Sequence, residues 1–188
     1  MITPEIKQQL DKPLHWLVKY FPRRIQNVNA EQAITRQFVL NFKDGNILES
    51  NLAAVQIAYY MKRTYGPECK NIVFTCVPAS SREKYSLRFR DFSSHVCRLT
   101  SAMNGYSHIH VLRDRIPVHE SGNESDVRET ANVLIDEHYF RGKKVVCFDD
   151  VITRGLSFAN FACALESQGA NVIGGLFLAR THYNTKRN

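Results

Sequence analysis

KKVVCFDDVITRGLS, residues 143–157, carries the clearest indication of fold in this 188-residue chain. Its apolar run over residues 145–148 predicts a strand, because continuous apolar residues are typical of strands covered on both faces in a parallel sheet. Two adjacent acids, Asp149 and Asp150, follow that run directly. The sequence therefore places two carboxylates at the carboxyl edge of a parallel sheet, where open α/β sheets bind ligands.

A short loop and a helical pattern follow the acid pair. The loop supplies hydroxyl groups at Thr153 and Ser157 and a flexible backbone at Gly155, and FANFACALESQG then predicts a helix. Unpaired N–H groups in the first turn of a helix attract phosphate, whereas the carboxylates can accept hydrogen bonds from hydroxyl groups. A ligand with a phosphate beside a vicinal diol, such as ribose 5-phosphate, fits both halves.

The segment VVCFDDVITRGLS resembles the phosphoribosyl-pyrophosphate (PRPP) signature of the type I phosphoribosyltransferases. That signature is a hydrophobic strand, two acids, two apolar residues and Thr-Thr-Gly-x-Thr. The resemblance implies that Asp149 and Asp150 bind the ribose 2′- and 3′-hydroxyls. It also implies that the 5′-phosphate is wrapped by the loop residues, which are Thr153, Arg154, Gly155, Leu156 and Ser157. Arg154 and Ser157 depart from the signature but keep its backbone; the alternative is an ordinary strand-to-helix turn.

A second strand and loop precede this one in the chain. NIVFTCV, residues 71–77, predicts a buried strand, and PASSREKYSLRF follows it. In the transferases this position is the pyrophosphate loop. The resemblance assigns pyrophosphate binding to Ala79, Ser80, Ser81 and Arg82, with Arg88 nearby. Without the family, the same residues form a polar turn before a helix.

The remaining hydrophobic patterns predict alternating helices and strands. Helices are predicted over residues 3–20, 48–65, 89–103 and 127–140, and strands over 36–46 (ending in a tight turn), 107–112 and 171–181. Such alternation is typical of βαβ units. Together with the resemblance it predicts an α/β, type I phosphoribosyltransferase fold, with a mainly parallel central sheet flanked by helices, a small hood and a flexible loop.

We expect one domain over residues 1–188, with an N-terminal helical extension over 1–35 and a lid and hood region over 113–142. The polar segment RDRIPVHESGNESDV lies where a flexible loop of the transferase fold closes over PRPP. By resemblance, hood and lid contacts fall on Arg113, His119, Glu120, Asn123 and Arg128. An ordinary surface loop explains the same composition.

The similarity over residues 38–180 is closest to the competence protein F (ComF) branch of the transferases. It includes FVLNFKDGN, VPASSREKYSLRFRDF and the arginine-containing stretch around residues 112–146. The branch's N-terminal cysteine zinc module is absent, and its Arg-Gly-Phe-Asn string is replaced over residues 87–90 by Leu-Arg-Phe-Arg. Enzymes acting on 6-oxopurines usually carry Asp at the position of Thr153, so we rank purine salvage below an unidentified acceptor.

Composition limits the compartment and the partners. The net charge of +7 favours polyanionic partners: a nucleotide, pyrophosphate or a nucleic acid. The five scattered cysteines indicate a reducing, cytoplasmic environment rather than a disulfide frame or zinc ribbon. No apolar run approaches the roughly 18 residues of a membrane span, so no membrane partner is expected.

The function that the resemblance implies is Mg²⁺-dependent transfer of the 5-phosphoribosyl group from PRPP to an unidentified nitrogen acceptor, a base or an amine, with release of pyrophosphate. Mg²⁺ would be held mainly by PRPP and water near Asp149 and Asp150, without a direct protein ligand set. The general base is unassigned, with His119, Glu120 and Tyr85 as candidates. The alternative is a catalytically silent PRPP- or nucleotide-binding regulator, or a ComF-like protein associated with nucleic acid. A homodimer is also left open.

Overall fold

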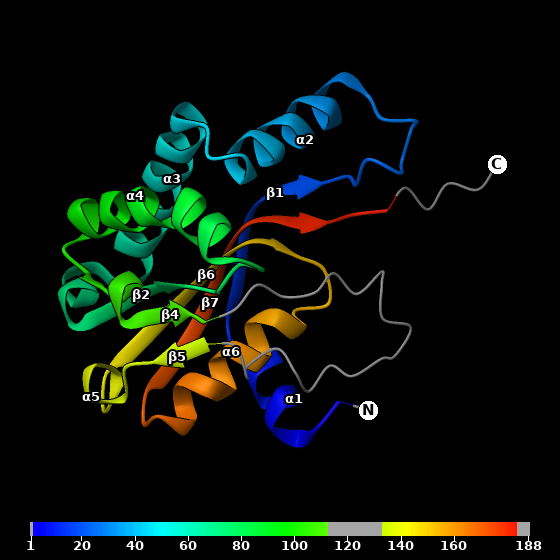
Figure 1. Cartoon of the computed structure of the whole chain (residues 1–188). Coiled ribbons are helices and arrows are strands. Elements are labelled where there is room, and N and C mark those ends of the chain that lie inside the picture. The colour runs from blue at the N-terminus through cyan, green and yellow to red at the C-terminus, as the bar shows by residue number, and fades with distance from the viewer. Residues whose placement is uncertain (1, 113–132, 184–188) are drawn as a thin grey trace.

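A computed structural model describes residues 2–112 and 133–183 of the chain. Its centre is a parallel sheet with the strand order β1-β7-β6-β2-β3 (Figure 1). The strands are β1 (Leu14–Tyr20), β2 (Ile72–Cys76), β3 (Met103–Asn104), β6 (Lys144–Ile152) and β7 (Asn171–Thr181). The expected mainly parallel α/β architecture is therefore confirmed, with β6 as the middle strand.

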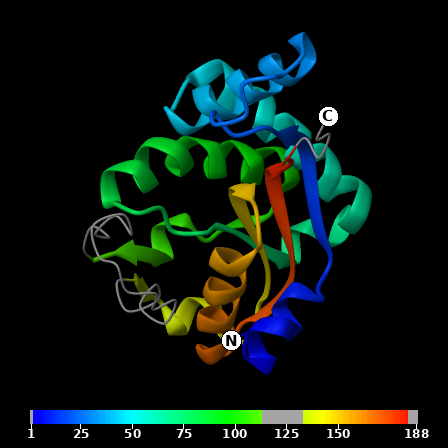
Figure 2. The same ribbon diagram turned by 90° about the vertical axis from the view of Figure 1, so that its right-hand side faces the viewer.

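Helices cover both faces of this sheet. They are α1 (Pro4–Leu10), α2 (Ala30–Lys43), α3 (Ile47–Tyr65), α4 (Arg82–Thr100), α5 (Glu137–Phe140) and α6 (Leu156–Ser167). Helices α2, α3 and α4 pack on one face, while α1 and α6 pack against each other on the opposite face (Figure 2). Two short 3₁₀ helices precede strands: Gly66–Asn71 leads into β2, and Tyr106–His108 leads into β4 (Ile109–Val111). Within the two described ranges, no helix is long and apolar enough to cross a membrane.

The helix predicted over residues 3–20 is wrong beyond Leu10. Leu14–Tyr20 forms β1, which pairs in parallel with β7 at the edge of the sheet. The carbonyl of Pro13 accepts a hydrogen bond from Gly175 N at 3.0 Å, and a Cβ on Gly174 would lie 2.8 Å from that carbonyl oxygen. Glycines in β7 thus permit a long-range pairing that the local pattern could not predict. The helical description of residues 1–35 holds only for α1 and the start of α2.

The strand predicted over residues 36–46 is also wrong, because this stretch belongs to α2. Asn29 caps the helix through a reciprocal capping box with Gln32, which satisfies two backbone N–H groups. Val39 and Phe42, three residues apart, are buried on one face of the helix. The apolar residues therefore follow the helical period, and Asp44 and Gly45 end a helix rather than a hairpin strand.

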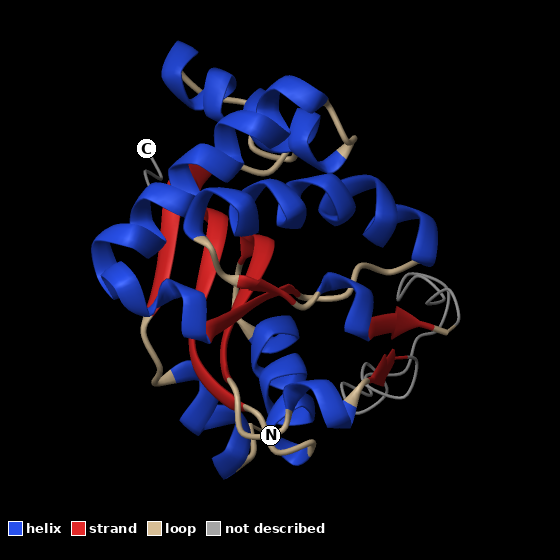
Figure 3. Cartoon of the chain, turned by 90° about the vertical axis from the view of Figure 1, so that its left-hand side faces the viewer, coloured by secondary structure: helices blue, strands red, loops and turns tan. Residues whose placement is uncertain are grey.

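The helix predicted over residues 127–140 is wrong over residues 133–135, the first that the structure describes, and its helical type holds at its end. Val133–Ile135 is strand β5, which pairs in antiparallel fashion with β4 (Ile109–Val111), and only Glu137–Phe140 is helical. This two-stranded sheet lies apart from the central one (Figure 3). The helix predicted from residue 89 begins earlier, at Arg82, because the Ser81 side chain caps it. The predictions over 48–65, 71–77, 107–112 and 171–181 identify the element type correctly.

An aromatic cluster joins the central strand to the helical layer. Phe148 of β6 contacts Phe92 of α4 with ring centroids 4.5 Å apart, and Phe42 of α2 meets Phe92 edge to face at 5.2 Å. All three side chains are fully buried. Asp149 and Asp150 follow Phe148 directly, so the acid pair stands at the end of a fully buried aromatic cluster.

Candidate functional site

The acid pair lies where the central sheet becomes narrower. Strand β2 ends with Cys76 opposite Phe148, whereas β7 continues beside β6 as far as Arg180, opposite Ile152. The backbone N–H of Val77 donates to the carbonyl of Phe148 at 2.7 Å. Asp149 and Asp150 are therefore beyond the carboxyl end of one neighbouring strand and beside the loop that follows it.

Asp150 is buried within a network of two cations. Its side chain is 8% exposed; Oδ1 lies 2.7 Å from Lys43 Nζ and Oδ2 lies 3.0 Å from Arg88 Nη1. Arg88 Nε also donates to the carbonyl of Lys43 at 2.8 Å. The network ties the C-terminus of α2 and the middle of α4 to β6. A buried carboxylate with both oxygens paired is a structural anchor in this state.

Lys43 was missed by sequence reasoning, and Arg88 was expected elsewhere. Lys43 is 107 residues from Asp150 in the chain and was expected in a hairpin turn. Arg88, which the resemblance assigns to pyrophosphate, instead contacts Asp150. To bind pyrophosphate, the Arg88 guanidinium would have to leave this ion pair.

Asp149 has a different environment from its neighbour. Consecutive strand side chains point to opposite faces of a sheet, so Asp149 faces away from the Lys43 and Arg88 cations. Its Oδ1 accepts a hydrogen bond from the Asp150 N–H at 2.8 Å. Burial raises the pKa of Asp149 well above its ordinary value, and the nearby charge of Asp150 raises it further. Hydroxyl donors or a bound cation would favour the charged form of this carboxyl group.

The predicted 5′-phosphate loop makes a tight connection from β6 to α6. Gly155 has φ of +77°, and a Cβ there would lie 2.7 Å from Leu10. The hydroxyls of Thr153 and Thr181 lie 2.7 Å apart and tie the loop to the end of β7. No side chain caps the start of α6, whose first residue is Leu156. The loop thus ends at a helix whose first N–H groups have no side-chain cap, which suits an anion.

The predicted pyrophosphate loop connects β2 to α4. Ala79, Ser80 and Ser81 are partly buried, and Arg82 is exposed at the first position of the helix. The Ser81 hydroxyl already accepts a hydrogen bond from Lys84 N at 3.2 Å. Because β2 and β6 are parallel neighbours, this loop and the loop after β6 leave the sheet at the same edge.

Of the candidate general bases, the structure describes Tyr85 and not the other two. Tyr85 is 3% exposed, and its hydroxyl donates to the carbonyl of Cys76 at 3.4 Å. Burial raises the pKa of Tyr85 well above its ordinary value, so this buried phenol is poorly suited to accept a proton from a substrate. The other sequence candidates lie outside the described residues: Arg113, His119, Glu120, Asn123 and Arg128.

The chemistry of the acid pair bears on the predicted Mg²⁺. Among the described residues, no group of three or more His, Cys, Asp or Glu side chains could hold a metal ion. Lys43 and Arg88 already neutralise Asp150, which leaves Asp149 as the member of the pair that faces away from both cations. These residues fit a hydrated Mg²⁺ that contacts Asp149 through water better than an ion held by the protein alone.

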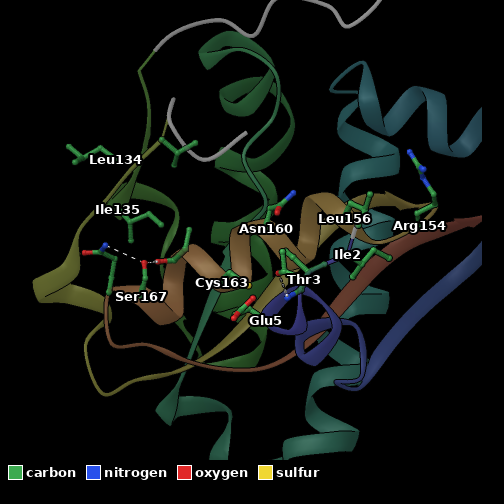
Figure 4. Close-up of a pocket in the computed structure, with 14 residues that line it drawn as sticks. Ile2, Thr3, Glu5, Leu134, Ile135, Arg154, Leu156, Asn160, Cys163 and Ser167 are labelled. Atoms are coloured by element: carbon green, nitrogen blue, oxygen red, sulfur yellow. Dashed lines mark hydrogen bonds between the residues drawn. The ribbon is translucent and has the colours of Figure 1, made fainter. Parts of the chain in front are cut away.

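A groove of about 840 Å³ lies between α1, β5 and α6 (Figure 4). Arg154 and Leu156, from the predicted 5′-phosphate loop and the start of α6, contribute to its wall, and Ser167 lines it near the other end of α6. Neither Asp149 nor Asp150 is among its lining residues. The groove and the acid pair are therefore distinct features that share only the loop between them.

Neither a protein-family profile nor a curated protein sequence matches this chain. Among solved structures, a hypoxanthine phosphoribosyltransferase from Staphylococcus aureus in an orthorhombic crystal has 11% identity and a TM-score of 0.37, with coverage of 74% of this chain and 69% of that one. Its tetragonal form has 14% identity and a TM-score of 0.37, covering 69% and 61%.

A third solved structure, a hypoxanthine-guanine-xanthine phosphoribosyltransferase, has 13% identity and a TM-score of 0.36, covering 74% of this chain and 66% of that one. In two of these three comparisons, the match spans less than two thirds of the other chain. Structural similarity this low does not indicate the activity of this chain.

Proposed function

We propose that this chain is a Mg²⁺-dependent phosphoribosyltransferase that transfers the 5-phosphoribosyl group of PRPP to a nitrogen acceptor and releases pyrophosphate. One observation carries the proposal. Two strand–loop–helix units, β2 to α4 and β6 to α6, are built on neighbouring parallel strands, and their loops leave the sheet at the same edge. The acid pair Asp149 and Asp150 lies near this edge, in the last part of β6. This arrangement offers two helix N-termini for the two anionic ends of PRPP and carboxylates for its diol.

Different residues bind different parts of PRPP. The loop over residues 153–157 takes the 5′-phosphate, and Asp149 accepts hydrogen bonds from the ribose hydroxyls. Asp150 fixes the strand through Lys43 and Arg88, so its own contact with the diol requires one of these cations to move. Positioning of the sugar lowers the barrier by removing much of the orientational entropy cost before reaction.

Departure of pyrophosphate builds negative charge beside the loop over residues 79–82. Backbone N–H groups at the start of α4 are preorganised donors for that charge, and each such donor is typically worth a few kcal/mol to the transition state. Mg²⁺, when bound with PRPP, would supply further neutralisation of the leaving group. The identity of the acceptor is left open, because Thr153 provides no carboxylate for a purine.

Calorimetric titration with PRPP and Mg²⁺ tests this proposal, with ribose 5-phosphate and pyrophosphate as comparison ligands. We expect Mg²⁺-dependent PRPP binding that weakens at least about tenfold in Asp149→Asn, corresponding to about 1.4 kcal/mol. Asp91→Asn, an exposed acid on α4, is the matched control and should bind as the parent does. Asp149→Asn is preferred to a change at Asp150, which would leave Lys43 and Arg88 without their shared carboxylate.

The outcomes separate the proposed function from its rivals. Release of pyrophosphate with a nitrogen base supports the transferase. Tight PRPP binding without release, across a panel of bases and amines, would replace it with a PRPP-binding regulator. Absence of binding to all three ligands would overturn the assignment of the pocket.

A further inference from the structure

Helix α3 carries an apolar stripe on its outer surface. Leu48, Leu52, Val55 and Tyr59 are 64%, 51%, 50% and 62% exposed. Their spacing of four, three and four residues places them along one side of the helix. The opposite side of the same helix is buried in the core through Ala53, Ala54, Ile57, Ala58 and Met61. An amphipathic helix needs only that inner face, so the outer stripe requires a separate explanation.

The stripe is a concentrated feature of the described surface. Among the described residues, five of the exposed large apolar side chains belong to α3: Ile47 and the four residues of the stripe. Leu87 of α4 is also exposed and lies against Gly45, just before α3 begins. Helix α3 lies on the outside of the helical layer (Figures 1 and 2). Contiguous apolar patches of this kind mark interaction surfaces.

The charges around the stripe resemble the rim of an interface. No charged residue occurs from Ser50 to Met61, and the exposed polar neighbours in this part are the amides Asn51 and Gln56. On α3 the exposed charges are Lys62 and Arg63 in its last turn, whereas Asp44 stands just before the helix and the partly buried Glu49 lies in its first turn. A core depleted of charge with a polar rim is the usual anatomy of a protein–protein contact.

From these features we infer that the outer face of α3 binds the same face of a second copy, with the two helices antiparallel about a twofold axis. The spacing four-three-four reads the same in both directions, so an antiparallel copy places Leu48 opposite Tyr59 and Leu52 opposite Val55. This self-complementarity is what a twofold interface requires. The spacing also equals that of a coiled-coil seam.

Charge complementarity selects a second copy over an unrelated helix. In the antiparallel arrangement, the acidic end of one stripe, at Asp44, meets the basic end of the other, at Lys62 and Arg63. The stripe covers 12 residues, with about 16 Å of helix between its two end residues. A contact of this length is smaller than a standard interface, so we expect a dimer that dissociates at micromolar concentration.

Sedimentation velocity over roughly 5 to 200 µM tests the association, a range suited to a contact of this size. We expect the parent mass to rise from one copy to two, and Leu52→Lys to remain a monomer with at least about tenfold weaker association. Ile34→Lys, which changes an even more exposed apolar residue on α2, is the matched control and should dimerise normally. Circular dichroism and the melting temperature verify that each variant is folded.

Reversed charges test the antiparallel arrangement. Arg63→Asp and Asp44→Arg should each weaken self-association, because like charges then face each other at both ends. An equimolar mixture of the two variants should restore the dimer, because both contacts regain opposite charges. A parent that stays monomeric throughout, a Leu52→Lys variant that dimerises normally, or a mixture no tighter than the single variants would overturn the inference. None of these outcomes depends on PRPP binding.

Discussion

At the scale of single residues, the two neighbouring acids have opposite energetic characters. Asp150 is paired with Lys43 and Arg88, whereas Asp149 is partly buried on the other face, close to the charge of Asp150. A sequence of two identical residues thus yields one structural anchor and one carboxyl group with a strongly raised pKa. Perturbed carboxyl groups of this kind are common at functional sites.

Asp149→Asn should stabilise the protein at neutral pH. The pKa of Asp149 is raised in the folded state above the ordinary value of 3.8, so the folded protein binds more protons and loses stability as pH rises above that value. We expect the variant to gain about 1–3 kcal/mol at pH near 7, and the gain to vanish near pH 4. Urea denaturation at both pH values measures this difference.

The exposed-acid variant Asp91→Asn should show no comparable pH-dependent gain. If Asp149→Asn instead loses the same stability at both pH values, the side chain is engaged in a favourable interaction rather than in an unfavourable burial. Taken with the expected loss of PRPP affinity, greater stability with weaker binding would indicate that this acid is retained for function.

Arg88→Met should destabilise the fold by about 2–4 kcal/mol, because it leaves the buried Asp150 carboxylate with one cation instead of two. Arg90→Met, on the same helix but exposed, should change stability by no more than about 0.5 kcal/mol. Chemical denaturation of both variants measures the contrast. Equal effects would mean that the Arg88–Asp150 pair contributes little, and Arg88 would then be free to serve the predicted pyrophosphate contact.

At the scale of elements, the β6–loop–α6 unit depends on its glycine. Gly155→Ala adds a Cβ at a positive φ and within 2.7 Å of Leu10, so we expect a loss of about 2 kcal/mol and weaker PRPP binding. Gly142→Ala is a matched control, because Gly142 has φ of +72° with no atom within 4 Å of the added Cβ. It should lose only the conformational part, about 1 kcal/mol, and keep its affinity.

Thermal melting and calorimetry on both glycine variants supply the measurements. Unchanged PRPP affinity in Gly155→Ala would argue against the assignment of this loop to the 5′-phosphate. A shared loss of stability with a selective loss of binding would support it.

At the scale of the whole molecule, helix α2 connects the aromatic core to the acid pair through direct contacts. Phe42 packs against Phe92 and Phe148, and the next residue, Lys43, holds Asp150. Any shift of α2 therefore reaches the end of β6 directly. The aromatic cluster supports the site as well as the fold.

Phe42→Ala should cost about 3–5 kcal/mol, because it removes a fully buried aromatic side chain and leaves a cavity. Ile34→Ala, exposed on the same helix, should cost no more than about 0.5 kcal/mol. Denaturation midpoints and slopes, measured together with PRPP affinity, report both consequences. Preserved affinity in a strongly destabilised Phe42→Ala variant would show that the site tolerates movement of α2.

The central unit of the fold could be predicted from local sequence patterns. The apolar run over residues 145–148, the acids after it and the glycine of the loop specify strand, edge and turn, because each depends on local chemistry. The strand before Val77 and the long helix over 48–65 were predicted for the same reason. Residues 14–20 and 36–46 were assigned wrongly, because pairing with β7 and burial against the aromatic cluster outweigh local propensity.

The environment of each residue in the candidate site depends on contacts between distant segments of the chain. The pairing of Asp150 with Lys43 and Arg88 joins residues up to 107 positions apart, and no sequence pattern predicts it. The burial that raises the pKa of Asp149 and the position of Tyr85 inside the core likewise depend on neighbours from distant segments. Electrostatic environment is a property of the folded surroundings, so residue types predict a candidate site, whereas packing sets the environment of each charge in it.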